Sequence, residues 1–144
     1  HVLTDNRHAL VVDSQTTVAS GTAEVDAALT MLDRRPGTRR LTVAADKNYD
    51  QKRFVAGARA ANVTPHVAQH TRGRRSAIDA RTTRHAGYAQ SRNARHRVET
   101  PFGWGKFNRP LKQTMLRGLA RVGAQATLVF TSYNLVRIAA LEAA

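Results

Sequence analysis

Short apolar runs alternate with polar segments through the first half of the chain, and their lengths predict strands and helices. Runs at residues 2–4 and 9–12, separated by turn-forming residues 5–7, predict a β-hairpin whose second strand continues through 16–19. A helix with Thr22 as its cap follows and ends before the next proline. The chain is therefore expected to begin with a hairpin and a helix.

Two further strands, with a helix between them, complete this pattern. Residues 41–45 and 63–68 are apolar runs of strand length, and the segment between them carries apolar residues at helical spacing. We expect Asp50 to open that helix and Asn62 to cap its C-terminal end. The succession of strand, helix and strand indicates an α/β fold.

The second half of the chain is less periodic. Residues 70–93 are rich in arginine and predict an exposed basic loop with one helical turn. Residues 111–116 predict a short helical or extended segment, and 119–142 predict a long apolar helix. A second apolar stripe at Leu128 and Leu135 predicts that this helix is buried on more than one side.

Composition narrows the class of protein. The chain has 144 residues, which is the length of one ordinary domain, so we expect residues 1–144 to form a single domain. The absence of cysteine excludes disulfides, thiolate metal sites and cysteine catalysis. No apolar run approaches the ~20 residues that span a membrane, and no signal peptide is visible.

The net charge is +13, and it is concentrated in one part of the chain. Residues 61–144 contain fourteen basic and three acidic residues, whereas residues 1–60 contain nine basic and seven acidic ones. Such a field attracts polyanions through phosphate contacts and counterion release. We therefore expect a nucleic acid as partner and no membrane contact; charge alone leaves both DNA and RNA open.

Two carboxylates stand out as candidate site residues. Asp46 directly follows an apolar strand, the position at which open α/β sheets place binding groups, but it can equally be a turn or cap residue. Glu99 lies among basic residues, where it can hold a divalent cation or form surface ion pairs. His66 and His70 have the spacing of a helical zinc pair, but Pro65 favours a strand, so we expect no zinc site.

Residues 45–50 and 95–99 resemble motifs of the DDE transposases of bacterial insertion sequences, most closely the insertion sequence five group. They read Ala-Asp-Lys-Asn-Tyr-Asp and Arg-His-Arg-Val-Glu. The resemblance covers nearly the whole chain and implies an RNase H-like fold, in which a mixed sheet is flanked by helices. The other stretches that carry it are 1–3, 6–8, 10–13, 21–24, 63–69, 73–79, 102–104, 117–122 and 133–137.

The resemblance implies metal-dependent cleavage and strand transfer of DNA by three carboxylates that bind Mg²⁺ or Mn²⁺. It assigns Asp46 as the second acid and Glu99 as the third, because Arg95, Glu99 and Lys106 match the Arg-x3-Glu-x6-Lys spacing. These two acids are the expected catalytic and metal-binding residues. The residues expected to contact DNA are Arg72, Arg74, Arg75, Arg92, Arg95, Arg97 and Lys106.

The sequence also departs from the family pattern. Arg92 replaces a tyrosine, Asn48 replaces a glycine, and Pro101 disfavours a helix around Glu99. Asp13 does not match the first acid, which the family carries on an earlier strand. We therefore expect a C-terminal part of a catalytic domain, with an incomplete sheet and no activity alone.

Three functions remain open. The first is a truncated transposase, the second is a non-catalytic remnant that binds DNA, and the third is a basic domain that binds RNA or ribosomes. The resemblance favours the first and implies duplex DNA as partner, a homo-oligomer for the full-length protein, and a bacterial cytoplasmic, nucleoid-associated location.

Overall fold

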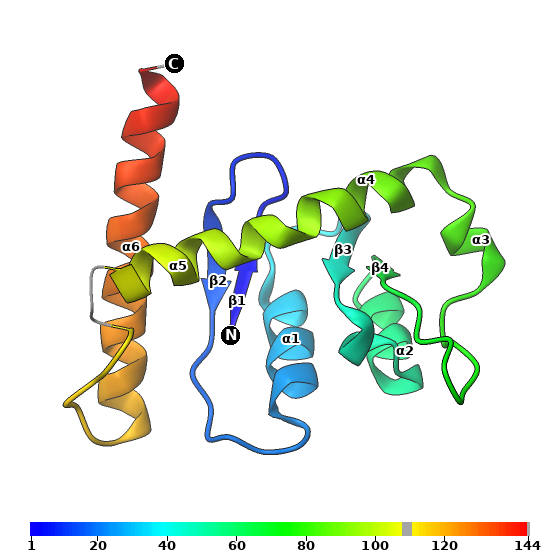
Figure 1. Ribbon diagram of the computed structural model, residues 1–144, viewed down its shortest axis with the longest axis horizontal. Coiled ribbons are helices and arrows are strands. Elements are labelled where there is room, and N and C mark those ends of the chain that lie inside the picture. The colour runs from blue at the N-terminus through cyan, green and yellow to red at the C-terminus, as the bar shows by residue number, and fades with distance from the viewer. Residues whose placement is uncertain (108–110, 144) are drawn as a thin grey trace. The chain divides into compact units, whose positions relative to one another are not determined.

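The computed structural model describes residues 1–107 and 111–143, which form a mixed α/β chain with two small sheets (Figure 1). This part of the chain divides into two compact units. One contains residues 1–27 together with 96–144, and the other contains 28–95. The α/β prediction is confirmed at this level.

The first unit opens with the predicted hairpin. Strands β1 (Val2–Thr4) and β2 (Val11–Ser14) pair antiparallel, with Val2 opposite Ser14. In the turn between them, the Asp5 carboxylate accepts the N–H groups of His8 at 2.9 Å and Leu10 at 2.7 Å. Residues 16–19 do not continue β2, contrary to expectation. The first residue of β1, Val2, already pairs with Ser14, so β1 offers no partner further along the chain.

Helices α5 (Glu99–Phe107) and α6 (Leu119–Glu142) belong to the same unit. The Phe102 and Phe130 rings meet edge to face at 5.7 Å between centroids, and α6 buries Val129, Phe130 and Tyr133. Tyr133 and Arg137 also donate hydrogen bonds to the turn of the hairpin, at the carbonyls of Ala9 and His8, both 3.0 Å long.

The Asn134 side chain binds β2 as a neighbouring strand would. Its Oδ1 accepts the Val11 N–H at 2.9 Å, and its Nδ2 donates to the Val11 carbonyl at 2.8 Å. Since Val11 is thereby satisfied on both backbone groups, the amide joins α6 to the hairpin in a fixed register.

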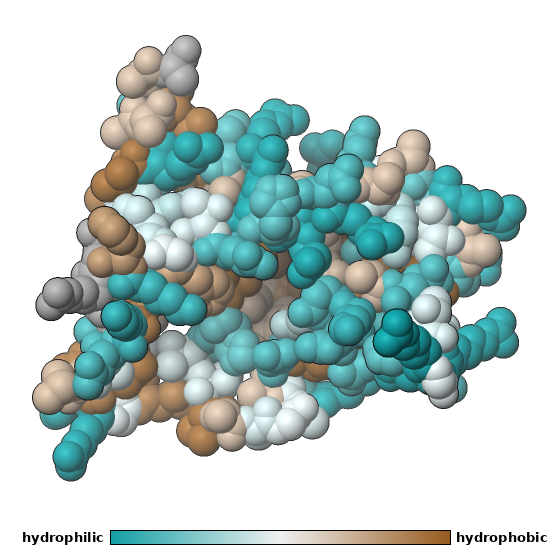
Figure 2. Space-filling view, in the orientation of Figure 1, coloured by the Kyte–Doolittle hydropathy of each residue, from teal (hydrophilic) through white to brown (hydrophobic). Residues whose placement is uncertain are grey.

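The predicted long helix is confirmed, but its predicted burial is wrong. Leu128 is 69% exposed and Leu135 is 64% exposed, so the second apolar stripe faces solvent; hydrophobic side chains are visible along α6 in Figure 2. Even so, no helix in the described ranges has the length and apolarity that crossing a membrane requires. The segment 111–116 forms neither helix nor strand, contrary to expectation.

The second unit is built around a parallel pair of strands. Strands β3 (Leu41–Ala45) and β4 (Val63–Val67) lie where the sequence predicted them, with Leu41 opposite Val63. A short 3₁₀ helix, η1 (Lys47–Tyr49), and helix α2 (Lys52–Ala60) connect them, because parallel neighbours require a crossover.

The core of this unit lies between α2, β4 and the end of α1 (Ala23–Arg34). Phe54, Val63 and Val67 are each no more than 2% exposed. Gly57 lets α1 approach α2 closely, since a Cβ built at this position would lie 2.6 Å from a methyl group of Leu29. The C-cap of α2 is Ala61 rather than the predicted Asn62, which follows it with φ +57.

The predicted basic loop at 70–93 is wrong in its second part. Helices α3 (Ala80–Thr83) and α4 (Ala86–Ala94) occupy most of residues 80–94, followed by a 3₁₀ helix, η2 (Arg95–Val98). Tyr88 and Ser91 are buried, and the Tyr88 hydroxyl donates to the Val67 carbonyl at 2.7 Å. These helices were missed because polar caps and polar buried side chains, rather than an apolar stripe, define them.

We predict that the Asn134→Ala substitution destabilises the protein by about 1–3 kcal/mol, since it leaves two half-buried backbone groups of Val11 without their partner. Urea unfolding followed by circular dichroism measures this change.

The matched control is Ser132→Ala on the exposed side of the same helix, with an expected change within about 0.5 kcal/mol. Equal effects of the two substitutions would contradict the role given to the Asn134 amide.

Candidate functional site

Asp46 lies directly after β3, at the carboxyl end of the parallel pair, as the sequence predicted. Its Oδ1 accepts the Asn48 N–H at 2.8 Å, so the carboxylate caps η1 and its orientation is fixed locally. Asn48 replaces the family's glycine without strain, because the described non-glycine residues with positive φ are Ala9 and Asn62. The cap role of Asp46 is thus observed, and its catalytic role stays a prediction.

Glu99 is the first residue of α5 and is exposed. Pro101 does not prevent this helix, because it occupies the third helical position, where an N–H has no partner within the helix. The 3₁₀ segment η2 lies immediately before this start. Glu99 therefore lies where the helical run 86–107 changes from 3₁₀ to α-helix.

A shared metal site for Asp46 and Glu99 stays a prediction, since the two acids belong to different compact units. Carboxylate oxygens are suitable ligands for Mg²⁺ or Mn²⁺, so both residues fit such an ion chemically. Within residues 1–107 and 111–143, no group of three or more histidine or acidic residues is arranged to hold a metal. The two acids alone are fewer than the three-carboxylate set that the motifs imply.

The candidate DNA-contacting residues fall into three structural settings. Arg72, Arg74 and Arg75 are exposed on the segment between β4 and α3. The guanidinium of Arg92 lies over the Tyr88 ring, 5.9 Å from its centroid. Arg97 donates from Nη1 to the carbonyls of Asn6 and Arg7, so it also fastens the turn of the hairpin.

The remaining two candidates lie on helical segments. Arg95 begins η2 and is half-buried, and Lys106 is exposed near the end of α5. Three of the four aromatic side chains in the basic region pack rather than face solvent: Tyr88, Phe102 and Trp104, whose ring meets that of Tyr133. Phe107 is 87% exposed.

Asp50 holds the basic segment in place, a role that the sequence did not reveal. It was expected to open α2, but that helix begins at Lys52, and Asp50 is only 2% exposed. Its Oδ2 accepts the His70 N–H at 2.7 Å and its Oδ1 accepts the Ala77 N–H at 2.8 Å. One carboxylate therefore closes the ends of a loop whose tip carries Arg72, Arg74 and Arg75.

The ionisation of Asp50 follows from these bonds. Burial by itself raises the pKa of Asp50, but hydrogen bonds from His70, Ser76 and Ala77, with the charge of Arg74, outweigh burial and hold the pKa below its ordinary value. The Asp50 carboxylate therefore accepts these hydrogen bonds in its ionised form. Its stabilising contribution is present above the ordinary carboxyl pKa and is lost as the pH falls through the lowered value.

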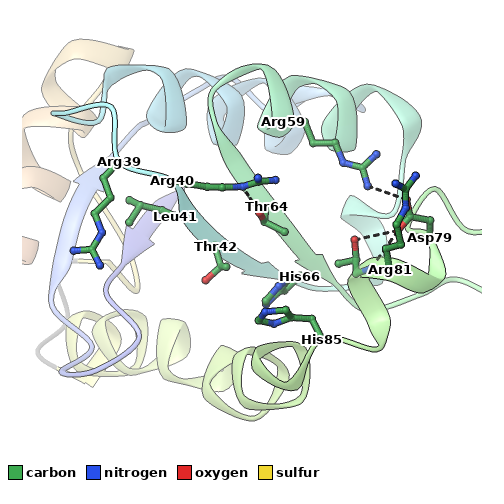
Figure 3. Close-up of a pocket in the computed structure, with 11 residues that line it drawn as sticks. Arg39, Arg40, Leu41, Thr42, Arg59, Thr64, His66, Asp79, Arg81 and His85 are labelled. Atoms are coloured by element: carbon green, nitrogen blue, oxygen red, sulfur yellow. Dashed lines mark hydrogen bonds and ion pairs between the residues drawn. The ribbon is translucent and has the colours of Figure 1, made fainter.

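A cleft of about 810 Å³ lies within the same unit, and arginines dominate its lining (Figure 3). Its residues are Arg39, Arg40, Leu41, Thr42, Arg59, Thr64, His66, Asp79, Arg81, Thr82 and His85. Asp79 caps α3 and forms ion pairs with Arg59 at 3.6 Å and Arg81 at 3.8 Å. The arginine pair directly before β3 was the one available sequence signal for this cleft.

His66 lies on the wall of the cleft, on β4. Its Nδ1 is 2.7 Å from the Ser91 hydroxyl, and His70 lies beyond the end of β4. Burial, together with the neighbouring His85, holds the pKa of His66 below its ordinary value, so His66 is neutral at pH 7. The positive charge of the cleft therefore comes from its arginines.

Comparison with known proteins agrees with the motif pattern. The family model described as "Transposase DDE domain" matches residues 1–135. The chain belongs to this family of DNA-transposing proteins, whose members act on DNA and generally use divalent metal ions. No curated protein and no solved structure matches the chain.

We predict that Asp50→Asn loosens the basic loop. An asparagine in the same orientation presents an NH₂ group to a backbone N–H, so one hydrogen bond is lost and the charge is removed. We expect a destabilisation of about 1–3 kcal/mol and faster tryptic cleavage after Arg72, Arg74 and Arg75, measured by mass spectrometry.

The control is Asp33→Asn, which removes the same charge from an exposed position at the end of α1. If both variants are cleaved at the wild-type rate, Asp50 does not order the loop.

Proposed function

We propose that this chain is the C-terminal part of the catalytic domain of an insertion-sequence transposase of the insertion sequence five group, with an RNase H-like fold. In this proposal, Asp46 and Glu99 are two of three carboxylates that hold Mg²⁺ or Mn²⁺ during DNA cleavage and strand transfer. The observation that carries it is the position of Asp46: a carboxylate fixed at the carboxyl end of β3, in a chain of the DDE family.

Each proposed ligand has a defined task. The hydrogen bond from the Asn48 N–H orients the Asp46 carboxylate without an ion. The exposed Glu99 presents both oxygens of its carboxylate from the first turn of α5. When bound, the divalent ions supply activation of water and stabilisation of the leaving oxygen. Arg95 and Lys106 contact the phosphates that flank the reacting bond.

The third carboxylate comes, in this proposal, from a strand outside the chain. Among the described residues β3 pairs with β4 alone, so its second edge is open to a further strand. A strand added at this edge would lie beside the segment that carries Asp46.

The duplex is proposed to follow the exposed arginines Arg72, Arg74 and Arg75, together with Arg92 and Arg97. A convex basic loop suits a duplex, because proteins contact duplex DNA by placing protruding elements along its backbone and grooves. Such a protein would work at the bacterial nucleoid in the cytoplasm, and the full-length protein would act as a homo-oligomer.

A second candidate is a non-catalytic DNA-binding remnant. The observation in its favour is that no set of three potential metal ligands exists in the described part of the chain. The two candidates differ in one outcome: only the first gains activity when the missing strand is supplied.

We predict that the chain alone does not nick DNA carrying the ends of its element in the presence of Mn²⁺, whereas a version extended by the upstream strand does. Asp46→Asn abolishes the activity of the extended version, because a carboxamide cannot replace the anionic ligand. The nicking activity of each protein is measured by agarose gel electrophoresis of the plasmid.

The control is Asp33→Asn in the extended version, which keeps its activity. Nicking by the bare chain that depends on Asp46 would disprove the incomplete site, and an inactive extended version would favour the DNA-binding remnant.

We also predict that duplex binding depends steeply on salt. Six phosphate contacts give a slope of about −5 in a plot of log affinity against log salt, and replacing Arg72, Arg74 and Arg75 by alanine reduces the slope by about 3. Fluorescence anisotropy at several salt concentrations measures this.

The matched variant replaces Lys112, Arg117 and Arg121, three exposed residues of the same charge in the other unit. If it flattens the slope equally, net charge rather than the loop governs binding.

A further inference from the structure

The basic cleft of residues 28–95 is separate from the proposed carboxylate centre. Arg39, Arg40, Leu41 and Thr42 line it at the amino end of β3, and its lining continues along β4 to His66, which pairs with Ala44. Asp46, which follows the carboxyl end of β3, is not among the lining residues. Five strand residues at about 3.3 Å per step put about 13 Å between the two ends of β3. A ligand at the amino end therefore contacts different protein groups from one at Asp46.

Charge and hydrogen-bonding groups in the cleft suit phosphate. Four arginines line it against a single carboxylate, Asp79. Figure 3 shows Arg39 and Arg40 at one end, with Arg81 and Asp79 at the other. One guanidinium group can bind two oxygens of a phosphate at once. Two arginines at each end of the cleft can therefore hold successive phosphates of one chain.

Three of these arginines make weak or neutral contacts that a phosphate could replace. Arg40 Nε donates to the Thr64 hydroxyl at 3.1 Å, a neutral partner. Arg59 and Arg81 share Asp79 at 3.6 and 3.8 Å, distances that are long for charge-assisted hydrogen bonds. A phosphate entering between them competes with one partly exposed carboxylate.

The shape of the cleft distinguishes a strand from a duplex. A concavity of about 810 Å³ is within the range of roughly 300–1,000 Å³ that holds small ligands. Duplex DNA is itself grooved and is read by protein elements that protrude, as the loop with Arg72, Arg74 and Arg75 does. A hollow lined by guanidinium groups, with Leu41 and His85 beside them, instead suits one sugar–phosphate chain with exposed bases.

We propose that this cleft binds the phosphates of a single DNA strand that has left the duplex, at a site separate from Asp46. The proposal rests on the proposed function, because it takes DNA as the substrate. It adds a second class of DNA contact: the convex loop holds the duplex, and the cleft holds an unpaired strand. Asp79 acts there as an internal anion that an incoming phosphate displaces.

Asp79 provides a test in which affinity should rise. Hydrogen bonding from the Thr82 N–H and the charges of Arg59 and Arg81 hold the pKa of Asp79 below its ordinary value, so it is ionised when the strand arrives. Asp79→Asn removes the competing charge but keeps the cap of α3, since asparagine is as good an N-cap as aspartate. A residue with a purely structural role would not tighten binding when replaced.

The experiment measures anisotropy of a short labelled single strand, without divalent ions, on the unmodified chain and its variants. Arg39→Ala with Arg40→Ala is expected to weaken binding by at least about tenfold, and Asp79→Asn to tighten it by about fivefold. Arg117→Ala with Arg121→Ala and Asp33→Asn change the charge equally at exposed positions that do not line the cleft, and are expected to have effects below about twofold. Thermal unfolding of each variant checks that it remains folded.

Competitors identify the ligand. An unlabelled single strand should displace the probe at lower concentration than a blunt duplex of the same length, and the preference should vanish in the Arg39→Ala, Arg40→Ala variant. Displacement by pyrophosphate as effective as by the strand would show a site for free phosphate groups and overturn the DNA assignment. Equal effects of the cleft and control variants would overturn the site itself. Either result would leave Asp46-dependent nicking, and with it the proposed function, untouched.

Discussion

A single buried carboxylate, Asp50, joins the two segments that leave the parallel strand pair. It lies four residues after Asp46 on the segment that follows β3, and it accepts N–H groups at both ends of the loop that follows β4. Because each accepted bond favours the ionised form, the loop and the charge stabilise one another. The position of the basic loop relative to the segment carrying Asp46 therefore depends on this one residue.

Basic side chains occupy three kinds of position in this protein. Arg97 and Arg137 donate to carbonyl groups of the hairpin turn, where they replace backbone partners that a two-stranded sheet cannot provide. Arg72, Arg74 and Arg75 extend from a loop, and Arg39 and Arg40 border a cleft. The basic side chains thus hydrogen-bond within the fold, extend from an exposed loop, and line a cleft.

Sequence patterns succeeded where local spacing dictates the structure. The strands at 41–45 and 63–67, the long helix from Leu119 and the turn at Asp5 all follow from apolar periodicity or turn chemistry within a few residues. The same patterns failed at α3 and α4, whose caps Asp79 and His85 are polar and whose buried residues include Thr82 and Ser91. They also overestimated the burial of α6, since apolar residues at helical spacing do not ensure that a partner covers them.

The family, the strand that directly precedes Asp46 and the excess of basic residues could be read from the sequence, because each depends on contiguous motifs or on composition. Contacts between distant segments, by contrast, set the surroundings of each acid. Asp50 and Asp46 lie in one motif, yet one is buried against a loop 20 residues further on and the other caps the next turn. Likewise Arg39, Arg59 and Arg81 share a cleft only because β3, α2 and α3 bring them together. Such convergence depends on contacts between distant segments, which no local pattern encodes.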